Sequence, residues 1–297
     1  MRNIFKSAYH QFYCYLFADR IIGKYPQIKA KDNRVNLFDY HPELEIDKRF
    51  SDTRYNLGDY LGFVIVEAML EKRGLTLDSW VPVRKHLKAV GSNVFASFQR
   101  STLWGSGVHH IPGNSLRYFY YYPLLRLDIR AVRGPLTREI LLQYGHKCPE
   151  VYGDPAILMP LIYKPNRTKT DGILVIPQFV TEKRFREEHP DLRIVSMNTN
   201  DYKTVIDAIA SSKKVITSSL HAVILADAYG VPSVLFRGLR EKIDFKYLDY
   251  YASTGRYDIH IAETFEEACK MEPLPLPDLS SLQKGLIDTF PYDLWEY

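Results

Sequence analysis

Residues 214–236 read KVITSSLHAVILADAYGVPSVLF and leave the backbone few alternatives. A short β-branched run over 214–217 meets a Thr-Ser-Ser turn, an apolar stretch over 220–229 follows, and Gly-Val-Pro ends it. This pattern predicts a strand, a tight polar turn, a helix and a second strand. Either Ser218 or Ser219 suits the N-cap position, so His221 is expected in the first helical turn.

That position gives His221 a possible chemical role. The start of a helix gathers unpaired N–H groups and the positive end of the helix dipole, and open α/β folds hold anionic ligands there. A single histidine near a helix start is also commonly a hydrogen-bonded packing residue. Both interpretations stay open at this point, with His221 as the first candidate for catalysis.

The rest of the chain repeats the alternation of strand and helix in two halves. Strands are expected near 34–40, 88–90, 102–104, 130–132 and 151–160 in the first half, with helices over 61–72 and 135–144. The polar stretch 163–171 is the best linker, and beyond it strands at 172–177 and 192–197 alternate with helices at 182–188 and 202–211. This order predicts parallel sheets and two Rossmann-like halves with a cleft between them.

The predicted domain boundaries follow from this pattern. We expect an N-terminal helix over 1–33, an N-terminal Rossmann-like domain over 34–162, a C-terminal one over 163–270, and a C-terminal helix and tail over 271–297. The N-terminal segment is apolar and aromatic but carries Lys6, Asp19 and Arg20, so it predicts an amphipathic helix rather than a signal peptide or a membrane span. Docking on the body of the protein and resting on a membrane surface are both open for it.

Small and polar residues follow several predicted strands or precede helices. Asn56, Gly58 and Asp59 precede the expected helix over 61–72, where they form either an ordinary turn or a ligand loop. Gly105 and Ser106 follow the expected strand at 102–104, where small residues allow a ligand or another backbone to approach closely. No P-loop or dinucleotide glycine spacing is present.

Arg133 follows the strand that ends at residue 132 and precedes Gly134 and Pro135. It is therefore expected at the carboxyl end of a strand, like the turn before His221. Arginine can bind a phosphate or carboxylate through two parallel hydrogen bonds. The alternative is a surface arginine paired with Glu139 or Glu150.

Composition narrows the class of ligand. The 297 residues are 46% hydrophobic and 25% charged, as in a soluble globular protein, and Lys plus Arg exceed Asp plus Glu by only 39 to 35. This mild surplus suits an anionic small molecule or an acidic membrane surface better than nucleic acid. Three scattered cysteines show no disulfide or metal-ligand spacing, and reduced thiols in the cytoplasm are expected. We predict no metal.

Five short motifs in order resemble the polysaccharide pyruvyl transferase family. They cover residues 56–59, 104–107, 132–138 and 153–155, and finally 218–221 together with 230–232. The resemblance spans about residues 56–251. It implies a GT-B-like arrangement with a donor site in the C-terminal half, an acceptor site in the N-terminal half, and phosphoenolpyruvate rather than a cofactor as the donor. The expected product is a pyruvate ketal on a sugar of a cell-surface polysaccharide or of its lipid-linked precursor.

The resemblance also implies roles for individual residues. His221 matches the proposed acid and Arg133 matches the donor-binding arginine. Lys246 is the closest match to a basic residue after the Gly-Val-Pro strand, with Arg237 and Arg240 as rivals. Many relatives carry arginine where this chain has Ser219, so that donor contact is either missing or supplied by Arg237 or Arg240.

The residues themselves are compatible with this chemistry. Phosphoenolpyruvate needs at least two anion contacts, which Arg133, the helix start near Ser218 and Ser219, and a downstream cation can give. A protonated His221 beside bound anions is a reasonable acid, and Asp59 is a candidate base. Two alternatives stay open: a GT-B glycosyltransferase that uses a nucleotide sugar, and a non-catalytic module that binds a glycan or an anion. A cytoplasmic location is expected, with contact at the inner face of the membrane as an alternative.

Overall fold

The computed structural model describes residues 35–37, 56–79, 85–97, 100–109, 122–166, 172–178, 181–238 and 245–296. The N-terminal helix predicted over 1–33 and the side chain of Arg240 lie outside these residues. Within the described ranges, no helix combines the length and the apolar character that crossing a membrane requires.

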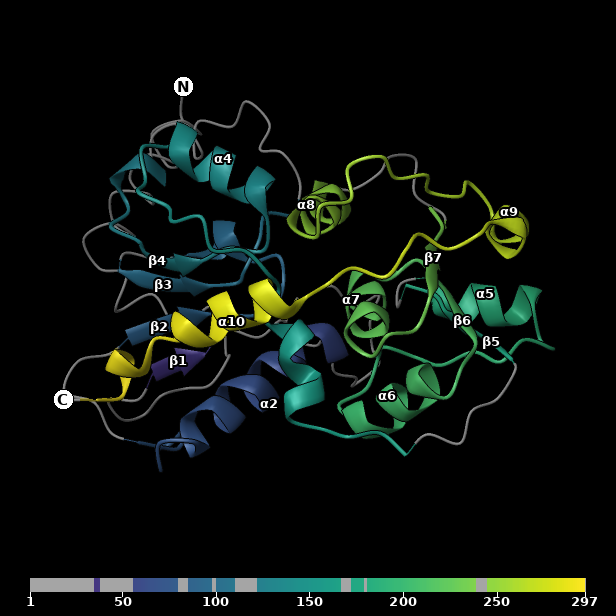
Figure 1. Cartoon of the computed structure of the whole chain (residues 1–297), viewed down its shortest axis with the longest axis horizontal. Coiled ribbons are helices and arrows are strands. Elements are labelled where there is room, and N and C mark those ends of the chain that lie inside the picture. The colour runs from purple at the N-terminus through teal and green to yellow at the C-terminus, as the bar shows by residue number, and fades with distance from the viewer. Residues whose placement is uncertain are drawn as a thin grey trace, which may run out of the picture.

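Four parallel strands form the first sheet (Figure 1). In sequence order and in spatial order they are β1 (Val35–Leu37), β2 (Lys85–Lys88), β3 (Ser101–Trp104) and β4 (Asp128–Ala131). All neighbouring pairs are parallel, so their carboxyl ends share one edge of the sheet. That edge carries Gly91, Gly105 and Arg133, each a few residues beyond its strand. The predicted parallel sheet is confirmed.

Helix α2 (Leu57–Glu71) starts four residues earlier than the sequence pattern predicts. Asn56 is its N-cap with an extended backbone, and the N–H of Leu57 donates to the carbonyl oxygen of Met197 at 2.8 Å. This contact with the other half of the chain fixes the helix start. Gly58 and Asp59 therefore lie in the first turn of a helix, and the loop predicted for them is wrong.

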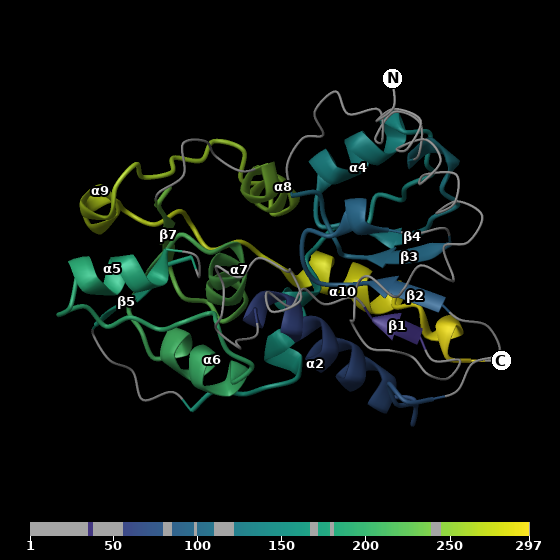
Figure 2. The same ribbon diagram turned by 180° about the vertical axis from the view of Figure 1, so that it is seen from behind.

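The second sheet contains β5 (Ile173–Ile176), β6 (Lys214–Thr217) and β7 (Ser233–Leu235), again parallel and in sequence order. Helices α5 (Glu182–Glu188), α6 (Tyr202–Ala210) and α7 (Leu220–Ala228) accompany it (Figure 2). The strand predicted over 192–197 is wrong, because this segment makes only an isolated bridge between Ile194 and Val175. The strand, turn, helix and strand predicted over 214–236 are confirmed.

The segment after β4 and α4 (Pro135–Gln143) departs from the prediction of a strand over 151–160. It forms a 3₁₀ helix, η6 (Pro155–Leu161), because the Asp154 side chain accepts a hydrogen bond from the N–H of Ala156 and Pro155 stands at the first position. Four of its residues, 156–159, are almost fully buried, and η6 packs against α2, α7 and α10 (Ser280–Asp288). One hydrophobic core therefore runs through η6 from the first sheet to α7.

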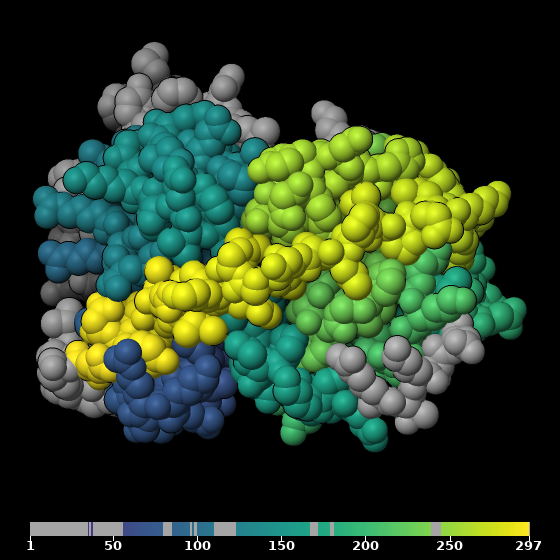
Figure 3. All heavy atoms as spheres, in the orientation of Figure 1, coloured from purple at the N-terminus to yellow at the C-terminus, as the bar shows by residue number. Residues whose placement is uncertain are grey.

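The C-terminal part returns to the first half of the molecule. After α8 (Phe245–Ser253) and α9 (Phe265–Lys270), α10 and the short helix η7 (Tyr292–Leu294) lie beside the first sheet and α2 (Figure 3). The indole of Trp104 donates to the carbonyl oxygen of Leu286 at 2.9 Å, and its ring meets Phe290 edge-on. The hydroxyl of Tyr292 donates to the carbonyl oxygen of Met69 at 2.9 Å.

The chain thus has an α/β fold with parallel, Rossmann-like sheets. The predicted GT-B-like arrangement, its cleft and the domain boundaries at 33, 162 and 270 stay predictions.

Candidate active site

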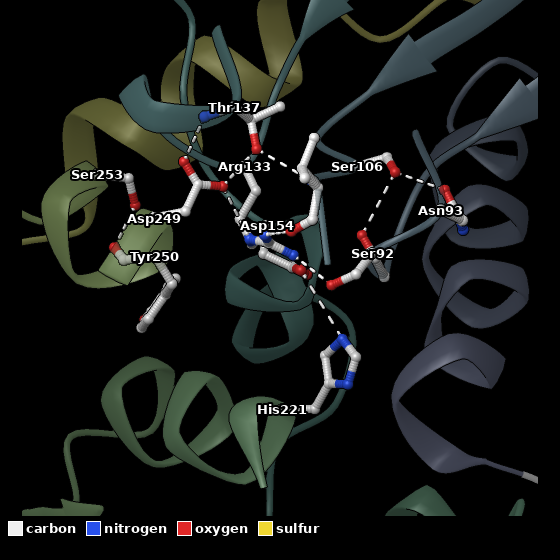
Figure 4. A network of polar contacts seen from close by, with 12 residues as sticks. Ser92, Asn93, Ser106, Arg133, Thr137, Asp154, His221, Asp249, Tyr250 and Ser253 are labelled. Atoms are coloured by element: carbon white, nitrogen blue, oxygen red, sulfur yellow. Dashed lines mark hydrogen bonds and ion pairs between the residues drawn. The ribbon is translucent and has the colours of Figure 1, made fainter. Parts of the chain in front are cut away.

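His221 is the second residue of α7, as the sequence predicts. Its side chain is 13% exposed, and its Nε2 atom lies 3.8 Å from Oδ2 of Asp154 (Figure 4). The ring rests against the first turn of α2, since a Cβ atom on Gly58 would fall 1.8 Å from His221 Nδ1. The motif that begins at Asn56 and the one that ends at His221 therefore meet in space. Gly58 contributes a bare backbone surface for the ring.

Asp154 is fully buried at the junction of the two halves. Its Oδ1 atom caps η6, whereas its Oδ2 atom makes no hydrogen bond within the described part of the chain. Burial raises the pKa of Asp154 to about 6, although hydrogen bonds from Ala156 and Gly91 and the charge of Arg133 act in the opposite direction. A buried carboxylate beside an imidazole is an arrangement that can hold a proton.

The environment of His221 favours its neutral form. Burial, together with the positive charges of Lys246 and Arg133, lowers the pKa of His221 to about 3. The acid role predicted from the sequence therefore requires a negative charge that this environment does not yet supply, such as that of a bound anion.

Arg133 is fully buried and lies at the carboxyl end of β4. Its guanidinium donates to Oδ2 of Asp249 at 3.1 Å, to Oγ of Ser92 at 2.6 Å and to the carbonyl oxygen of Val108 at 2.5 Å. A Cβ atom on Gly107 would lie 2.3 Å from its central carbon, so the glycine admits the guanidinium. The surface pairing considered as an alternative is wrong, since Arg138, not Arg133, pairs with Glu150.

Asp249 joins α8 to the start of α4. Its two carboxylate oxygens accept hydrogen bonds from the N–H and the hydroxyl of Thr137 as well as from Arg133. Gly134 is required there, because a Cβ atom would fall 2.0 Å from the carbonyl oxygen of Asp249. The same helix carries Lys246, whose charge reaches His221. The interaction with Asp249 thus holds both cations near the histidine.

Asp59 and Asn56 lie beside the same edge of the first sheet. The amide of Asn56 donates to Oδ2 of Asp59 at 2.7 Å, and Oδ1 of Asp59 lies where a Cβ atom on Gly91 would be. Asp59 is 8% exposed. Its neighbour Gly58 contacts the His221 ring, and its own carboxylate faces Gly91.

Gly105 and Ser106 both have structural roles at the edge of the first sheet. Gly105 has φ of +82°, and a Cβ atom there would lie 2.3 Å from the Pro155 ring. Ser106 is fully buried, and its hydroxyl contacts the side chain of Asn93 at 2.5 Å and the carbonyl oxygen of Gly91 at 3.3 Å. Gly105 thus allows the close approach of Pro155, and Ser106 connects the loop after β3 to the loop after β2.

The turn before α7 is also held by protein groups. Ser218 Oγ accepts from the N–H of Gln178 at 2.8 Å, and its carbonyl oxygen accepts from the Tyr247 hydroxyl at 2.8 Å. Ser219 is the N-cap, with an extended backbone and no capping bond from its side chain. Its N–H donates to the hydroxyl oxygen of Thr217 at 2.9 Å.

Of the rival cations, Arg237 pairs with Glu263 at 2.8 Å. Arg240 lies outside the described residues. The structure therefore brings together His221, Arg133, Lys246, Gly58 and Asp59.

Sequence reasoning gave no role to Asp154, Asp249 or Ser92. The Gly153-Asp154-Pro155 motif was the available signal for Asp154. No comparable local pattern marks Asp249 or Ser92. Among the residues described, no group of three or more His, Cys, Asp or Glu side chains could hold a metal ion.

Comparisons with known proteins show which family the chain belongs to. The chain is 26% identical over 212 residues to an uncharacterized protein of Acanthamoeba polyphaga mimivirus, covering 67% of this chain and 71% of that protein. A functionally uncharacterized protein from Klebsiella pneumoniae, known from its crystal structure, is 13% identical, with 74% of this chain and 88% of that chain covered and a TM-score of 0.45. Residues 56–238, more than half of the chain, match polysaccharide pyruvyl transferase. These residues contain every motif noted in the sequence and both partners of the His221–Asp154 contact, and the chain belongs to the polysaccharide pyruvyl transferase family.

Proposed function

We propose that this protein transfers the pyruvyl group of phosphoenolpyruvate to two hydroxyls of a sugar and forms a ketal. Family membership supports pyruvyl transfer to a polysaccharide. The observation that carries the finer proposal is the grouping of His221 with two cations, Arg133 and Lys246, whose charges both act on its ring. Such a grouping suits a donor with a carboxylate and a phosphate.

The proposed reaction assigns a proton transfer to His221. The protonated ring gives its proton to the methylene carbon of phosphoenolpyruvate, which becomes a methyl group, and the adjacent carbon gains oxocarbenium character. The two acceptor oxygens bond to that carbon as the bond to the phosphate oxygen breaks. One hydroxyl proton restores the acid and the other leaves with phosphate. Asp59, whose neighbour Gly58 contacts the ring, is the proposed base for an acceptor hydroxyl.

The negative charge of the donor would raise the pKa of His221, which is low in the ligand-free protein. Its pKa of about 3 leaves the ring neutral at neutral pH. A bound phosphate and carboxylate would offset Lys246 and Arg133 and raise the pKa of the ring. The acid would therefore be charged only when the donor is present, which limits proton loss to water.

Arg133 contributes to this proposal from within the protein. Three of its five N–H donors are used by Asp249, Ser92 and Val108. Its charge acts on the site from the interior, and Lys246, which is only partly buried, is the cation proposed to touch the donor. We further propose a cytoplasmic location, a saccharide acceptor that is free or lipid-linked, and no cofactor.

Calorimetric titration with phosphoenolpyruvate tests the proposal, with nucleotide sugars as competing ligands. Lys246→Met should weaken phosphoenolpyruvate binding about tenfold or more, since a contact between charged groups contributes about 1.5–3 kcal/mol. Lys203→Met removes a lysine from the exposed side of α6 and should leave the affinity unchanged. Arg133→Ala is a poor test, because it would leave Asp249 buried without its counter-charge.

Saturable binding that depends on Lys246 supports pyruvyl transfer. Binding of a nucleotide sugar with no response to phosphoenolpyruvate would contradict it.

A further inference from the structure

Two polar atoms at the centre of the molecule face each other without a hydrogen bond. Asp154 Oδ2 and His221 Nε2 are both buried, and neither has a hydrogen-bond partner in the part of the chain that is described. They lie 3.8 Å apart, which is longer than a direct hydrogen bond. Buried polar atoms left in this way are costly, so their retention calls for an explanation.

The surroundings fix both groups in place. Asp154 is held through Oδ1 by the N–H of Ala156, so Oδ2 keeps its direction toward α7. The His221 ring is limited on its other side by the backbone at Gly58. The 3.8 Å between Asp154 Oδ2 and His221 Nε2 exceeds the usual hydrogen-bond range, so direct sharing of a proton requires the imidazole to move toward Asp154. In Figure 4, Nε2 is the ring nitrogen directed at Asp154, and Nδ1 points away from it.

We propose that Asp154 and His221 share one proton and that Asp154 is the positioning residue for the acid: its carboxylate orients the ring and balances its positive charge. When the ligand-free protein takes up this proton, it resides on Oδ2 of Asp154, and a bound negative ligand shifts it to Nε2 of His221. This rests on the proposed function only for the identity of that ligand. The sharing itself is a property of the ligand-free protein.

Charged groups on other elements influence whether Asp154 or His221 holds the proton. Lys246 on α8 and Arg133 before α4 disfavour a charged ring, and Asp249 on α8 disfavours a charged Asp154. Asp59 on α2 lies against Gly91, whose N–H donates to the Asp154 carboxylate. Burial favours the uncharged arrangement of the pair, a protonated carboxyl beside a neutral imidazole, whereas Arg133 and the N–H of Gly91 favour the charged carboxylate of Asp154.

The test is a nuclear magnetic resonance titration of the histidine rings in the full chain, with His221→Gln used for assignment. In the parent protein the His221 ring should sense the uptake of one proton near pH 6, the range of the Asp154 pKa. In Asp154→Asn that step should vanish. The amide oxygen of asparagine can still cap η6, so the variant keeps the hydrogen bond to Ala156.

Asp227→Asn is the matched control. Asp227 is a buried carboxylate on the same helix as His221, but it pairs with Arg256 and Tyr250 instead. It makes the same chemical change and should leave the His221 titration intact. The carboxyl carbon signal of Asp154 in the parent gives a second readout that needs no variant, since it should titrate together with the ring.

Addition of phosphoenolpyruvate separates the two proposals. It should raise the pKa of the His221 ring in the parent and should do so less in Asp154→Asn. A ring that titrates identically in the parent and in Asp154→Asn overturns the shared proton. If the ligand-free step near pH 6 is present but phosphoenolpyruvate causes no change at any concentration, the proposed function fails and the shared proton stands.

Discussion

Gly58 has no room for a side chain, because the His221 ring occupies the place that a Cβ atom would take. Gly62 lies one turn later on α2, where a Cβ atom would meet its nearest neighbour, Val90, at an ordinary 3.8 Å. The neighbours of the two glycines therefore differ. A comparison of alanine variants at the two positions distinguishes the His221 contact from the general effect of glycine on helix stability.

Substitution of each glycine by alanine should therefore change stability in opposite directions. Gly58→Ala forces the ring away and should cost about 1–3 kcal/mol, as overpacking does. Gly62→Ala should gain about 0.5–1 kcal/mol through better helix propensity. Urea unfolding of both variants measures these changes. A shift of both free energies in the same direction would contradict the packing of His221 on Gly58.

At the scale of elements, a buried carboxylate links α8 to α4, beside the packing of Phe245 on the cluster that contains Ile140 and Leu141. Asp249 accepts from the start of α4 and from Arg133, and all of these groups are inaccessible to water. Such a pair contributes little over an apolar equivalent, but removal of one partner leaves the other charge uncompensated. The position of Lys246 on the same helix makes this attachment relevant to the site.

Asp249→Asn should destabilise the protein by about 3 kcal/mol or more, because Arg133 would remain buried without its counter-charge. Glu188→Gln provides the comparison, since it breaks an exposed pair with Arg184 at 2.6 Å and should change stability by less than about 1 kcal/mol. Chemical denaturation of the two variants gives both values. Equal small losses would show that the Arg133 charge is satisfied by Ser92 and Val108 alone.

The sequence predicted those elements whose signals are local. The β-branched run, the polar turn and the Gly-Val-Pro stop lie within one stretch, and they placed His221 in the first turn of α7 correctly. The start of α2 was missed, since it depends on a hydrogen bond from Leu57 to Met197, a residue far away in the sequence. The segment near Ile194 has a strand-like composition, yet it pairs with β5 only through one bridge.

The same distinction applies to the site. His221 and Arg133 stood out because their residue types occur beside helix starts and strand ends. Asp154 and Asp249 act through partners 67 and 116 residues distant in the chain, as the contacts of His221 and Arg133 show. Residue type alone also did not predict which side chains are accessible to a ligand. Ser106 and Arg133 have suitable polar groups, but both side chains are fully buried in the protein.

At the scale of the whole molecule, the two sheets share one core. η6 packs against α2 on one side and α7 on the other, and Leu286 of α10 is fully buried in the same cluster. The C-terminal residues therefore stabilise the first half of the chain as well as their own surroundings.

Leu286→Ala should destabilise the protein by about 2–5 kcal/mol, the usual range for such a buried leucine. Leu276→Ala is the matched control, because this leucine is 44% exposed and should change stability by less than about 0.5 kcal/mol. Thermal unfolding followed through tryptophan fluorescence and through far-ultraviolet circular dichroism should give one common transition for each variant. Separate transitions in the parent would contradict a shared core.

The return of the chain to its first half also affects how the protein is made. Trp104 leaves the ribosome long before Leu286 and Phe290, which complete its surroundings. During synthesis, the Trp104 face of the first sheet therefore stays exposed until α10 and Phe290 have been added. Removal of α10 together with Phe290 would leave Trp104 on the first sheet without these two contacts.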